Sequence, residues 1–210
     1  MNGLNLKIKV CGMKHQQNVD ELLELGVDYL GNIFYDQSPR SISQTGVKLT
    51  VNPAKKVGVF VKESIDVVKE KVKLHQFDVV QLHGADSNEI CKQVKELGIE
   101  VWRVCPITNG YDFSELQKFP DADYFLFDTK TEKHGGSGKK FDWSLLQRID
   151  KESPKKYFLA GGIGPIDAKE IKSLQLEKLY GLDLNSKFEI EPGLKNVELL
   201  KEFLNELRAS

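Results

Sequence analysis

The sequence predicts an α/β fold in which eight parallel strands close into a (β/α)8 barrel of the TIM type. Three observations predict it: short apolar runs recur along the chain, amphipathic segments separate them, and the chain has 210 residues. Nearly continuous apolar runs are typical of strands buried on both faces, and their alternation with helices indicates a parallel sheet. Eight repeats correspond to about 26 residues each, which suits a compact barrel of about 200 residues.

Eight strands are expected in order along the chain. Their ranges are Lys7–Cys11, Tyr29–Phe34, Lys56–Val61, Asp78–His83, Glu100–Ile107, Asp123–Thr129, Lys156–Gly161 and Lys178–Leu184. A doubly wound open sheet is the rival architecture, and it commonly carries a GxGxxG turn after its first strand. Here the first run continues as Cys11-Gly12-Met13 without that motif. We therefore expect one barrel domain over residues 1–210.

Amphipathic segments between the strands predict the helices. Apolar spacing, caps and stops mark Val19–Leu23 before Gly26, Ile65–Val72 after Ser64, Ile90–Leu97 with an Asp86…Glu89 capping box, Ala168–Leu174 and Leu200–Leu207. Weaker patterns predict short helices near Thr45–Val51 and Asp112–Phe119.

Composition narrows the class of protein. The chain is 40% hydrophobic and 29% charged, which excludes collagen, a disordered tail and a disulfide-dense miniprotein. Thirty basic residues against 31 acidic ones give no support for nucleic-acid or membrane-surface partners. The cysteines Cys11, Cys91 and Cys105 are odd in number and far apart, so we expect reduced thiols and a cytoplasmic location.

Polar residues and glycines gather just after the expected strands, where a barrel carries its active site. Glycine loops at Gly135–Gly138 and at Gly161-Gly162-Ile163-Gly164, the second before a helix start at Pro165–Lys172, suggest backbone contacts to a phosphate. One such loop alone is more commonly a turn, but two after late strands favour phosphate. Asp183, Asn185 and Ser186 follow the last strand.

Cys11 and Asp128 are the candidate reactive pair. Cys11 ends the first strand and should face the barrel mouth, although an isolated strand-end cysteine is more commonly a small core residue. Asp128 follows the apolar run Tyr124–Phe127, whose surroundings favour the protonated carboxyl of a general acid. Its alternative role is a loop cap. Together the thiol and the carboxyl suit proton-transfer chemistry.

Other polar residues offer binding contacts. The guanidinium of Arg40 can hold a substrate carboxylate in two hydrogen bonds, and a solvated surface arginine is an equal alternative. Gln81 and His83 can line the pocket, although His83 also fits an ordinary loop. Cys91 and Cys105 fit core positions. The histidines share no ligand spacing with the cysteines, so we expect no metal site.

The chain resembles the phosphoribosylanthranilate isomerase family in motifs that cover nearly its whole length in family order. They are Lys9-Val10-Cys11-Gly12-Met13, Ser38-Pro39-Arg40, Val57-Gly58-Val59-Phe60-Val61, Gln81-Leu82-His83-Gly84, Phe127-Asp128-Thr129, Gly135-Gly136-Ser137-Gly138, Phe141-Asp142-Trp143, Ala160-Gly161-Gly162-Ile163 and Pro192-Gly193-Leu194-Lys195.

The resemblance implies a metal-free Amadori rearrangement of N-(5-phosphoribosyl)anthranilate in tryptophan biosynthesis, with a small phosphosugar as partner and without a cofactor. It implies that Asp128 is the general acid, that Cys11 is the general base, and that Arg40 holds the anthranilate carboxylate. Further substrate contacts are expected from Gln81, His83 and Asp183, and phosphate contacts from Gly136, Ser137, Gly138, Gly161, Gly162, Asn185 and Ser186. We expect a monomer or a homodimer.

Two positions depart from the family pattern. Asn185-Ser186-Lys187 stands where the family usually has Ser-Gly, and Asn32 follows Gly31 where the family usually has phenylalanine. These departures motivate a rival hypothesis, a phosphosugar-binding barrel without catalysis. A second rival, a thiol-redox or covalent-nucleophile protein, is built on Cys11.

Overall fold

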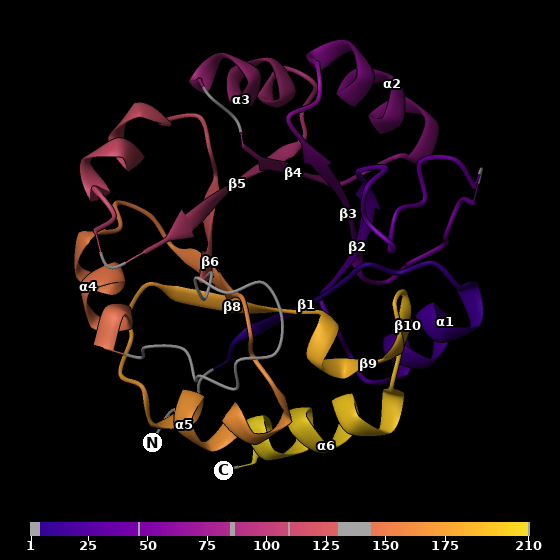
Figure 1. Ribbon diagram of the computed structural model, residues 1–210, viewed down its shortest axis with the longest axis vertical. Coiled ribbons are helices and arrows are strands. Elements are labelled where there is room, and N and C mark those ends of the chain that lie inside the picture. Colours follow the sequence, from indigo (N-terminus) through magenta and orange to yellow (C-terminus); the bar gives the residue numbers. More distant parts are fainter. Residues whose placement is uncertain (1–4, 46, 85–86, 109, 130–143, 210) are drawn as a thin grey trace.

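The computed structural model describes residues 5–45, 47–84, 87–108, 110–129 and 144–209. Eight parallel strands close into a barrel in chain order, and helices surround it (Figure 1). The strands are β1 (Lys7–Cys11), β2 (Tyr29–Phe34), β3 (Lys55–Val61), β4 (Val79–His83), β5 (Glu100–Ile107), β6 (Tyr124–Thr129), β7 (Tyr157–Ala160) and β8 (Leu179–Leu184). The predicted barrel is confirmed, with each strand boundary within one residue of its expected place.

Helices form an outer ring. They are α1 (Gln16–Glu24), α2 (Ile65–His75), α3 (Asn88–Lys95), α4 (Ser144–Glu152), α5 (Ala168–Ser173) and α6 (Val197–Arg208), with 3-10 turns η1 (Phe113–Lys118), η2 (Pro165–Asp167) and η3 (Ser186–Phe188). Ser64 caps α2 as predicted, because its hydroxyl accepts a hydrogen bond from Val67 N. The N-cap of α3 is Ser87, and Asp86, the first residue of the predicted capping box, lies outside the described residues.

The helix predicted near Thr45–Val51 is also wrong, because the described residues there form turn and irregular backbone. The side chain of Gln16 explains part of the difference. Its Nε2 donates to Thr50 O and its Oε1 accepts from Thr50 N, both at 2.9 Å. These bonds replace the helical partners of that backbone unit. The second weak pattern became the 3-10 turn η1 instead of an α-helix.

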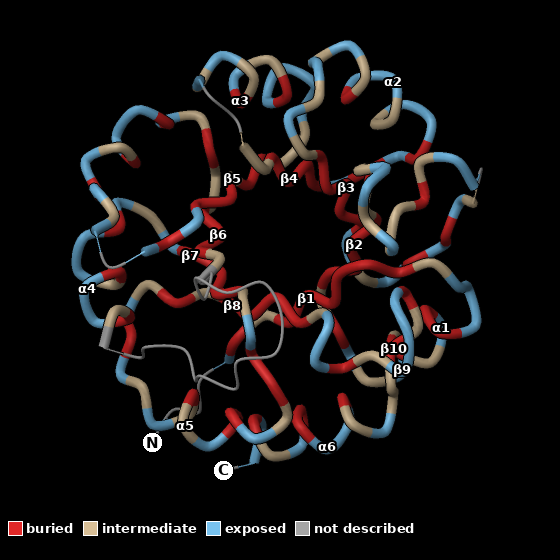
Figure 2. The backbone as a smooth tube through the Cα atoms, in the orientation of Figure 1, coloured by how far each residue is buried: buried red, intermediate tan, exposed pale blue. Residues whose placement is uncertain are grey.

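The buried residues form two layers, one inside the barrel and one between the barrel and the helices (Figure 2). Aromatic rings fill the N-terminal half of the barrel: Trp102 stacks on Phe158 at 4.0 Å, and Tyr29 meets Trp102 edge-on at 4.9 Å. Interdigitated rings of this kind pack as densely as an organic crystal. They form a solid floor, so any cavity within the barrel must open at the C-terminal ends of the strands.

One clamp recurs at the N-terminal rim. Asp28, just before β2, donates its N–H to Ile8 O and accepts from Ile8 N through Oδ2 at 2.8 Å. Asp78 repeats this exchange with Lys56, and Asp123 repeats it with Val101. Each carboxylate therefore ties an even strand to the first residues of the preceding odd strand.

A short antiparallel hairpin follows β8, and sequence patterns did not predict it. It consists of β9 (Glu189–Glu191) and β10 (Leu194–Lys195). Gly193 turns the chain at φ +94°, in the region that glycine adopts readily. Its N–H donates to the Glu189 carboxylate at 3.1 Å, which fixes that side chain beside the barrel.

Across the described residues, every helix is too short or too polar to cross a membrane.

Candidate active site

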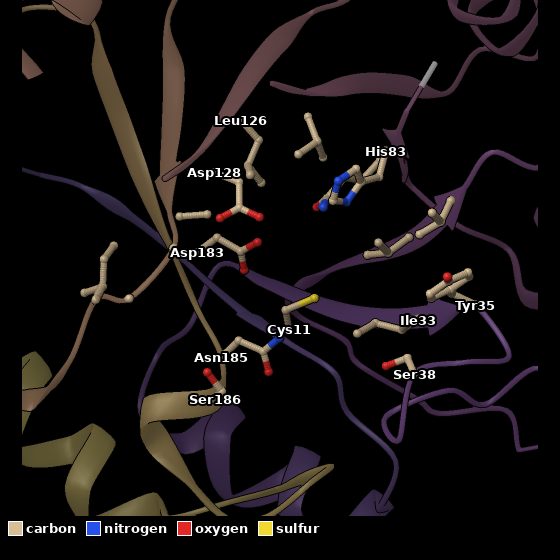
Figure 3. Close-up of a pocket in the computed structure, with 18 of the residues that line it drawn as sticks. Cys11, Ile33, Tyr35, Ser38, His83, Leu126, Asp128, Asp183, Asn185 and Ser186 are labelled. Carbon is tan, nitrogen blue, oxygen red and sulfur yellow. The ribbon is translucent and has the colours of Figure 1, made fainter. Parts of the chain in front are cut away.

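A cavity of about 310 Å³ opens at the C-terminal ends of the strands (Figure 3). Strand alternation brings its residues together, because every second side chain of a barrel strand points inward. The cavity is lined by most of the residues predicted from sequence, namely Cys11, Gln81, His83, Asp128, Gly161, Gly162, Asp183, Asn185 and Ser186. The predicted residues Gly136, Ser137 and Gly138 lie outside the described part of the chain.

Cys11 is the last residue of β1, and its sulfur points into the cavity (Figure 3). The residue is only 4% exposed. Its neighbour across the ladder is Gly31 on β2, where an added Cβ would lie 3.0 Å from Cys11 Sγ. A side chain at that position would push the sulfur aside. Gly31 therefore leaves the space that the thiol occupies.

Burial raises the pKa of the Cys11 thiol, because a thiolate is poorly solvated in this wall. The ammonium of Lys9 opposes that effect most strongly, and the ammonium of Lys195 adds to the opposition. The nearby carboxylate of Asp183 acts in the other direction. The charge state of the sulfur therefore depends on the balance between its burial, the two ammonium groups and the Asp183 carboxylate.

Asp128 lies near the end of β6, between Pro106 on β5 and Ala160 on β7. Its carboxyl group projects into the same cavity as the thiol and lies beside that of Asp183 (Figure 3). The arrangement supplies a proton donor or acceptor on one wall and a sulfur on another. Two acid–base groups that face one bound molecule are what a proton-transfer reaction needs.

Lys9 and Asp183 are direct ladder neighbours on β1 and β8, and both point inward. Lys9 Nζ contacts Asp183 Oδ2 at 2.8 Å, and the lysine side chain is fully buried. Burial raises the pKa of the Asp183 carboxyl, while the adjacent ammonium lowers it. The remaining oxygen, Oδ1, is buried without a hydrogen-bond partner in the described residues. It can therefore accept a hydrogen bond from a bound molecule.

Gln81 and His83 extend the polar lining from β4. Gln81 Oε1 is a second buried oxygen that lacks a partner within the described ranges. The His83 ring is directed into the cavity (Figure 3). Because a buried oxygen without a partner is costly, such atoms are typical of places that a ligand completes.

Glycines and small polar residues form the end of the cavity beyond β7 and β8. Gly161 and Gly162 adopt φ +83° and +74°, and Ser186 belongs to the same cavity lining. Lys187 adds a positive charge there. The helix expected to begin at Pro165 begins instead at Ala168, after the 3-10 turn η2, and Gly164 N already donates to Asp167 Oδ2 at 2.7 Å.

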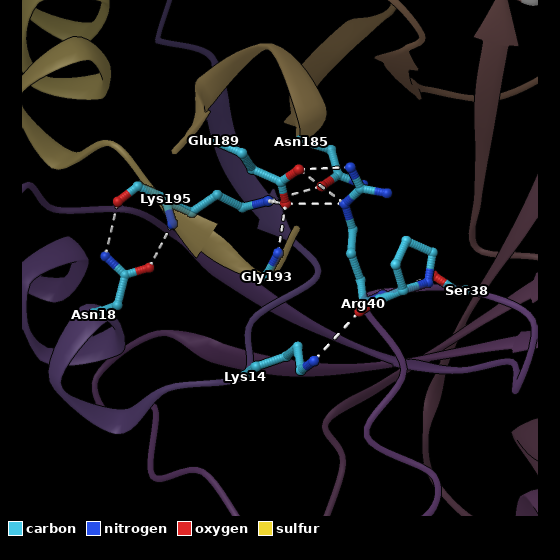
Figure 4. Close-up of polar contacts among 9 residues, drawn as sticks. Lys14, Asn18, Ser38, Arg40, Asn185, Glu189, Gly193 and Lys195 are labelled. Atoms are coloured by element: carbon cyan, nitrogen blue, oxygen red, sulfur yellow. Dashed lines mark hydrogen bonds and ion pairs between the residues drawn. The ribbon is translucent and has the colours of Figure 1, made fainter. Parts of the chain in front are cut away.

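Arg40 lies outside the described cavity lining, in an ion-pair network beside it (Figure 4). Its Nε contacts Glu189 Oε1 at 2.9 Å, and its Nη2 contacts Glu189 Oε2. Lys195 Nζ lies 2.6 Å from the same carboxylate and 2.7 Å from Asn185 Oδ1. This double pairing lowers the pKa of Glu189 to about 2. Gly12 permits the arrangement, since an added Cβ would lie 2.8 Å from Arg40 Cδ.

Sequence patterns missed Lys9, Glu189 and Lys195. A lysine interrupts the apolar pattern of a predicted strand and was therefore given no role. The signal that could have identified it is strand alternation, which turns Lys9 and Cys11 to the same face.

The structure explains the departure from the family pattern at Asn32. Leu30 and Phe34, two residues to either side, pack in the outer layer, and Asn32 Nδ2 donates to Met13 O at 3.1 Å. Asn32 therefore supports the loop after β1 from outside the barrel.

Within the described ranges, no three or more histidine, cysteine or carboxylate side chains lie together in a way that could hold a metal ion. The absence of a metal site stays a prediction.

Comparisons with known proteins agree with this geometry. The family model described as N-(5'-phosphoribosyl)anthranilate (PRA) isomerase matches residues 8–206. The chain is 40% identical to the N-(5'-phosphoribosyl)anthranilate isomerase of Parabacteroides distasonis, over 95% of this chain and 92% of that protein. It is 35% identical to the protein of that name from Bacillus cereus strain Q1, over 95% and 96%.

Solved structures give the same answer. Phosphoribosyl anthranilate isomerase from Thermotoga maritima superposes with a TM-score of 0.82 at 30% identity, over 98% of this chain and all of that one. A second isomerase structure, in complex with reduced 1-(o-carboxyphenylamino)-1-deoxyribulose 5-phosphate, has a TM-score of 0.79 at 26% identity, over 98% of this chain and all of that one. By sequence match over nearly its full length, the chain belongs to the N-(5'-phosphoribosyl)anthranilate isomerase family.

Proposed function

We propose that this protein isomerises N-(5'-phosphoribosyl)anthranilate to 1-(o-carboxyphenylamino)-1-deoxyribulose 5-phosphate by an Amadori rearrangement. Membership of the isomerase family supports the reaction. The related complex with a reduced form of that product supports the substrate class. The observation that carries the assignment to this chain is the shared cavity of Cys11 and Asp128.

The reaction needs two proton transfers. Asp128 donates a proton to the ribose ring oxygen, the C1–O bond breaks, and the nitrogen lone pair forms the C=N bond of a protonated Schiff base. Cys11, as the thiolate, then removes the proton from C2, and the electrons of that C–H bond form a C1=C2 enolamine. Tautomerisation gains a proton at C1 and loses one from the 2-hydroxyl to give the ketone. General acid–base groups at these positions suffice for the chemistry.

The two anionic ends of the substrate need separate anchors. Gly161, Gly162 and Ser186 line the end of the cavity that suits the phosphate, and Lys187 supplies charge there. The edge of the Arg40 guanidinium opposite Glu189 can take the anthranilate carboxylate in two hydrogen bonds. Asp183 Oδ1 and Gln81 Oε1 can accept hydrogen bonds from ribose hydroxyls.

The free thiols support an enzyme that works in the cytoplasm, since Cys11, Cys91 and Cys105 are all unpaired. We include in the proposal that residues 1–210 form one domain, without a cofactor. The chain then acts as a monomer or a homodimer. One related Thermotoga maritima isomerase is described as dimeric, which makes the dimer a specific alternative.

The test follows the fluorescence of the anthranilate aminosugar with and without the protein. We expect the signal to decay faster with wild-type protein, and Cys11→Ala or Asp128→Asn to remove most of the acceleration. Cys91→Ala is the matched control, because Cys91 is buried in the outer layer, away from the cavity. A decay as slow as in buffer would leave a phosphosugar-binding barrel without catalysis. An adduct on Cys11 after incubation with substrate would make the thiol a nucleophile.

A further inference from the structure

Lys9 is a charged side chain with no exposed surface, inside the barrel and beneath the candidate base. Placing an ammonium there is unfavourable unless anions compensate it. Its pKa is nevertheless raised, because the attraction of Asp183 and of Cys11 together outweighs burial. Lys9 is therefore a cation held between a carboxylate and a sulfur.

Asp183 and Cys11 are placed differently relative to the Lys9 ammonium. Asp183 takes it in an ion pair of 2.8 Å along the ladder. Cys11 stands two residues further along the same strand face, so its sulfur faces the same side of β1 as the ammonium and is attracted by it. Gly31 keeps the pair together, since an added Cβ would meet Cys11 Sγ at 3.0 Å and Lys9 Cε at 3.3 Å.

The charges around the sulfur do not balance when Cys11 is a neutral thiol. The cations near the sulfur, which form what we call the wall together with Asp183 and Glu189, are Lys9, Lys195 and Arg40. Each interacts electrostatically with Cys11. Asp183 pairs with the first of these cations, and Glu189 pairs with the other two. Among these five groups one positive charge is left over, and a thiolate would neutralise it while Asp128 carries the proton of the general acid.

We propose that Lys9 is a positioning residue that stabilises the thiolate form of Cys11, so that the sulfur can accept the proton from substrate carbon. This inference rests on the proposed function, because only that reaction gives the thiolate a task. If Lys9 served only to pair with Asp183, Cys11 could remain a neutral thiol. The buried ammonium beside the sulfur and the excess positive charge around it both favour the thiolate.

Other groups facing the sulfur set the size of the effect. Asp183 on β8 repels a thiolate. Asp128 on β6 would repel it only after giving up its proton, and His83 lies on the cavity wall at the end of β4. Lys195 on β10 attracts a thiolate from behind Asn185, and Glu189 on β9 holds that lysine. Lys9 differs from these because it is fully buried on the same face of β1 as Cys11, with its Cε and the sulfur both next to Gly31. Its removal should therefore have the largest effect of any cation in the wall.

The test measures the ionisation of Cys11 without using substrate. The rate of Cys11 alkylation by iodoacetamide is followed against pH by peptide mass spectrometry in wild-type protein and in Lys9→Met. We expect the apparent pKa of the thiol to rise by about one unit or more, a tenfold loss of thiolate at a given pH. The acid limb of kcat/KM should move to higher pH by the same amount. An unchanged or lowered thiol pKa would overturn the proposal.

Asp183→Asn is the matched variant of opposite sign, because it removes a negative charge from the same pair and should lower the thiol pKa. If Lys9→Met fails to fold with Asp183 left unpaired, the double variant Lys9→Met/Asp183→Asn removes both charges. Its thiol pKa should exceed that of Asp183→Asn alone, and equal values would overturn the proposal. Alkylation of the buried Cys91 and Cys105 reports global opening in every variant.

The same experiment separates the two proposals. If wild-type protein turns over substrate but its thiol pKa is the same as in Lys9→Met, the role of Lys9 is overturned and the isomerase assignment stands. If wild-type protein shows no turnover but its thiol pKa still changes in Lys9→Met, the isomerase assignment is overturned and the effect of Lys9 on the thiol stands. A purely structural role would lower activity equally at every pH, without moving the acid limb.

Discussion

Both rims of the barrel carry aspartates, but the partners of their carboxyl groups differ. At the N-terminal rim, Asp28 and Asp123 each exchange two backbone hydrogen bonds with a neighbouring strand. Each also pairs with a lysine, at 2.7 Å. At the C-terminal rim, Asp183 keeps one buried oxygen without a partner in the described chain, and Asp128 faces a cavity.

The difference shows how one side-chain type acquires two functions. A carboxylate whose oxygens are occupied by strand amides ties the backbone together and has little left to offer a ligand. A carboxyl group that faces a cavity can exchange protons or bind a hydroxyl, at some cost in stability. Barrel enzymes separate these tasks by rim, which is why changes at each rim should have separate consequences.

The largest expected effect comes from the C-terminal rim. Asp128→Ala should lower kcat by about 10² to 10⁴, because the ring oxygen loses its proton donor. The free energy of unfolding should change little, since the side chain faces a cavity. Steady-state kinetics and urea unfolding of the same preparation check both statements. Loss of stability with retained kcat would place Asp128 with the structural carboxylates.

Glu189→Gln tests the network that orients Arg40. The amide cannot pair as an anion with Arg40 and Lys195, so the guanidinium loses its fixed direction. We expect KM to rise about tenfold, the equivalent of about 1.4 kcal/mol, with a smaller change in kcat. Substrate kinetics measure the split. A fall in kcat at unchanged KM would mean that Arg40 does not hold the carboxylate.

The features foreseen from sequence are those that depend on local pattern. Apolar runs located the strands, and their ends located Cys11 and Asp128, because a parallel barrel gathers all strand ends at one rim. Lys9 and Glu189 escaped because each acquires its meaning from a distant partner. Lys9 meets Asp183 across 174 residues of sequence, and Arg40 meets Glu189 across 149. Periodicity carries no information on such pairs.

The N-terminal rim should show the opposite response. Asp28→Ala leaves the buried N–H of Ile8 without its carboxylate acceptor and also removes the ion pair with Lys7. We expect the free energy of unfolding to fall by about 1–3 kcal/mol. Although β1 also carries Cys11, kcat should stay within about threefold, because the floor of aromatic rings separates the two ends of the strand. Urea unfolding and kinetics on one preparation test this, and a large loss of kcat would contradict it.

The smallest effect concerns His75, at the end of α2 on the same rim, which is 6% exposed and stacks on Phe77 at 5.4 Å. Burial lowers its pKa, and the positive charge of Lys56 lowers it further. The unfolded chain therefore binds a proton below about pH 6.5 while the folded protein does not. The free energy of unfolding consequently decreases as the pH is lowered, until the pH reaches the folded-state pKa.

Between about pH 7.5 and 5.5, His75 should remove at most about 1.4 kcal/mol from the free energy of unfolding. His75→Phe should flatten that part of the profile, because phenylalanine has no proton to bind and fits an aromatic cluster with Phe34 and Phe77. Urea midpoints for both proteins at each pH give the difference. The acid limb of kcat/KM should be the same in both, since it belongs to Cys11 at the other rim. A shift of that limb in His75→Phe would show that the two rims are coupled.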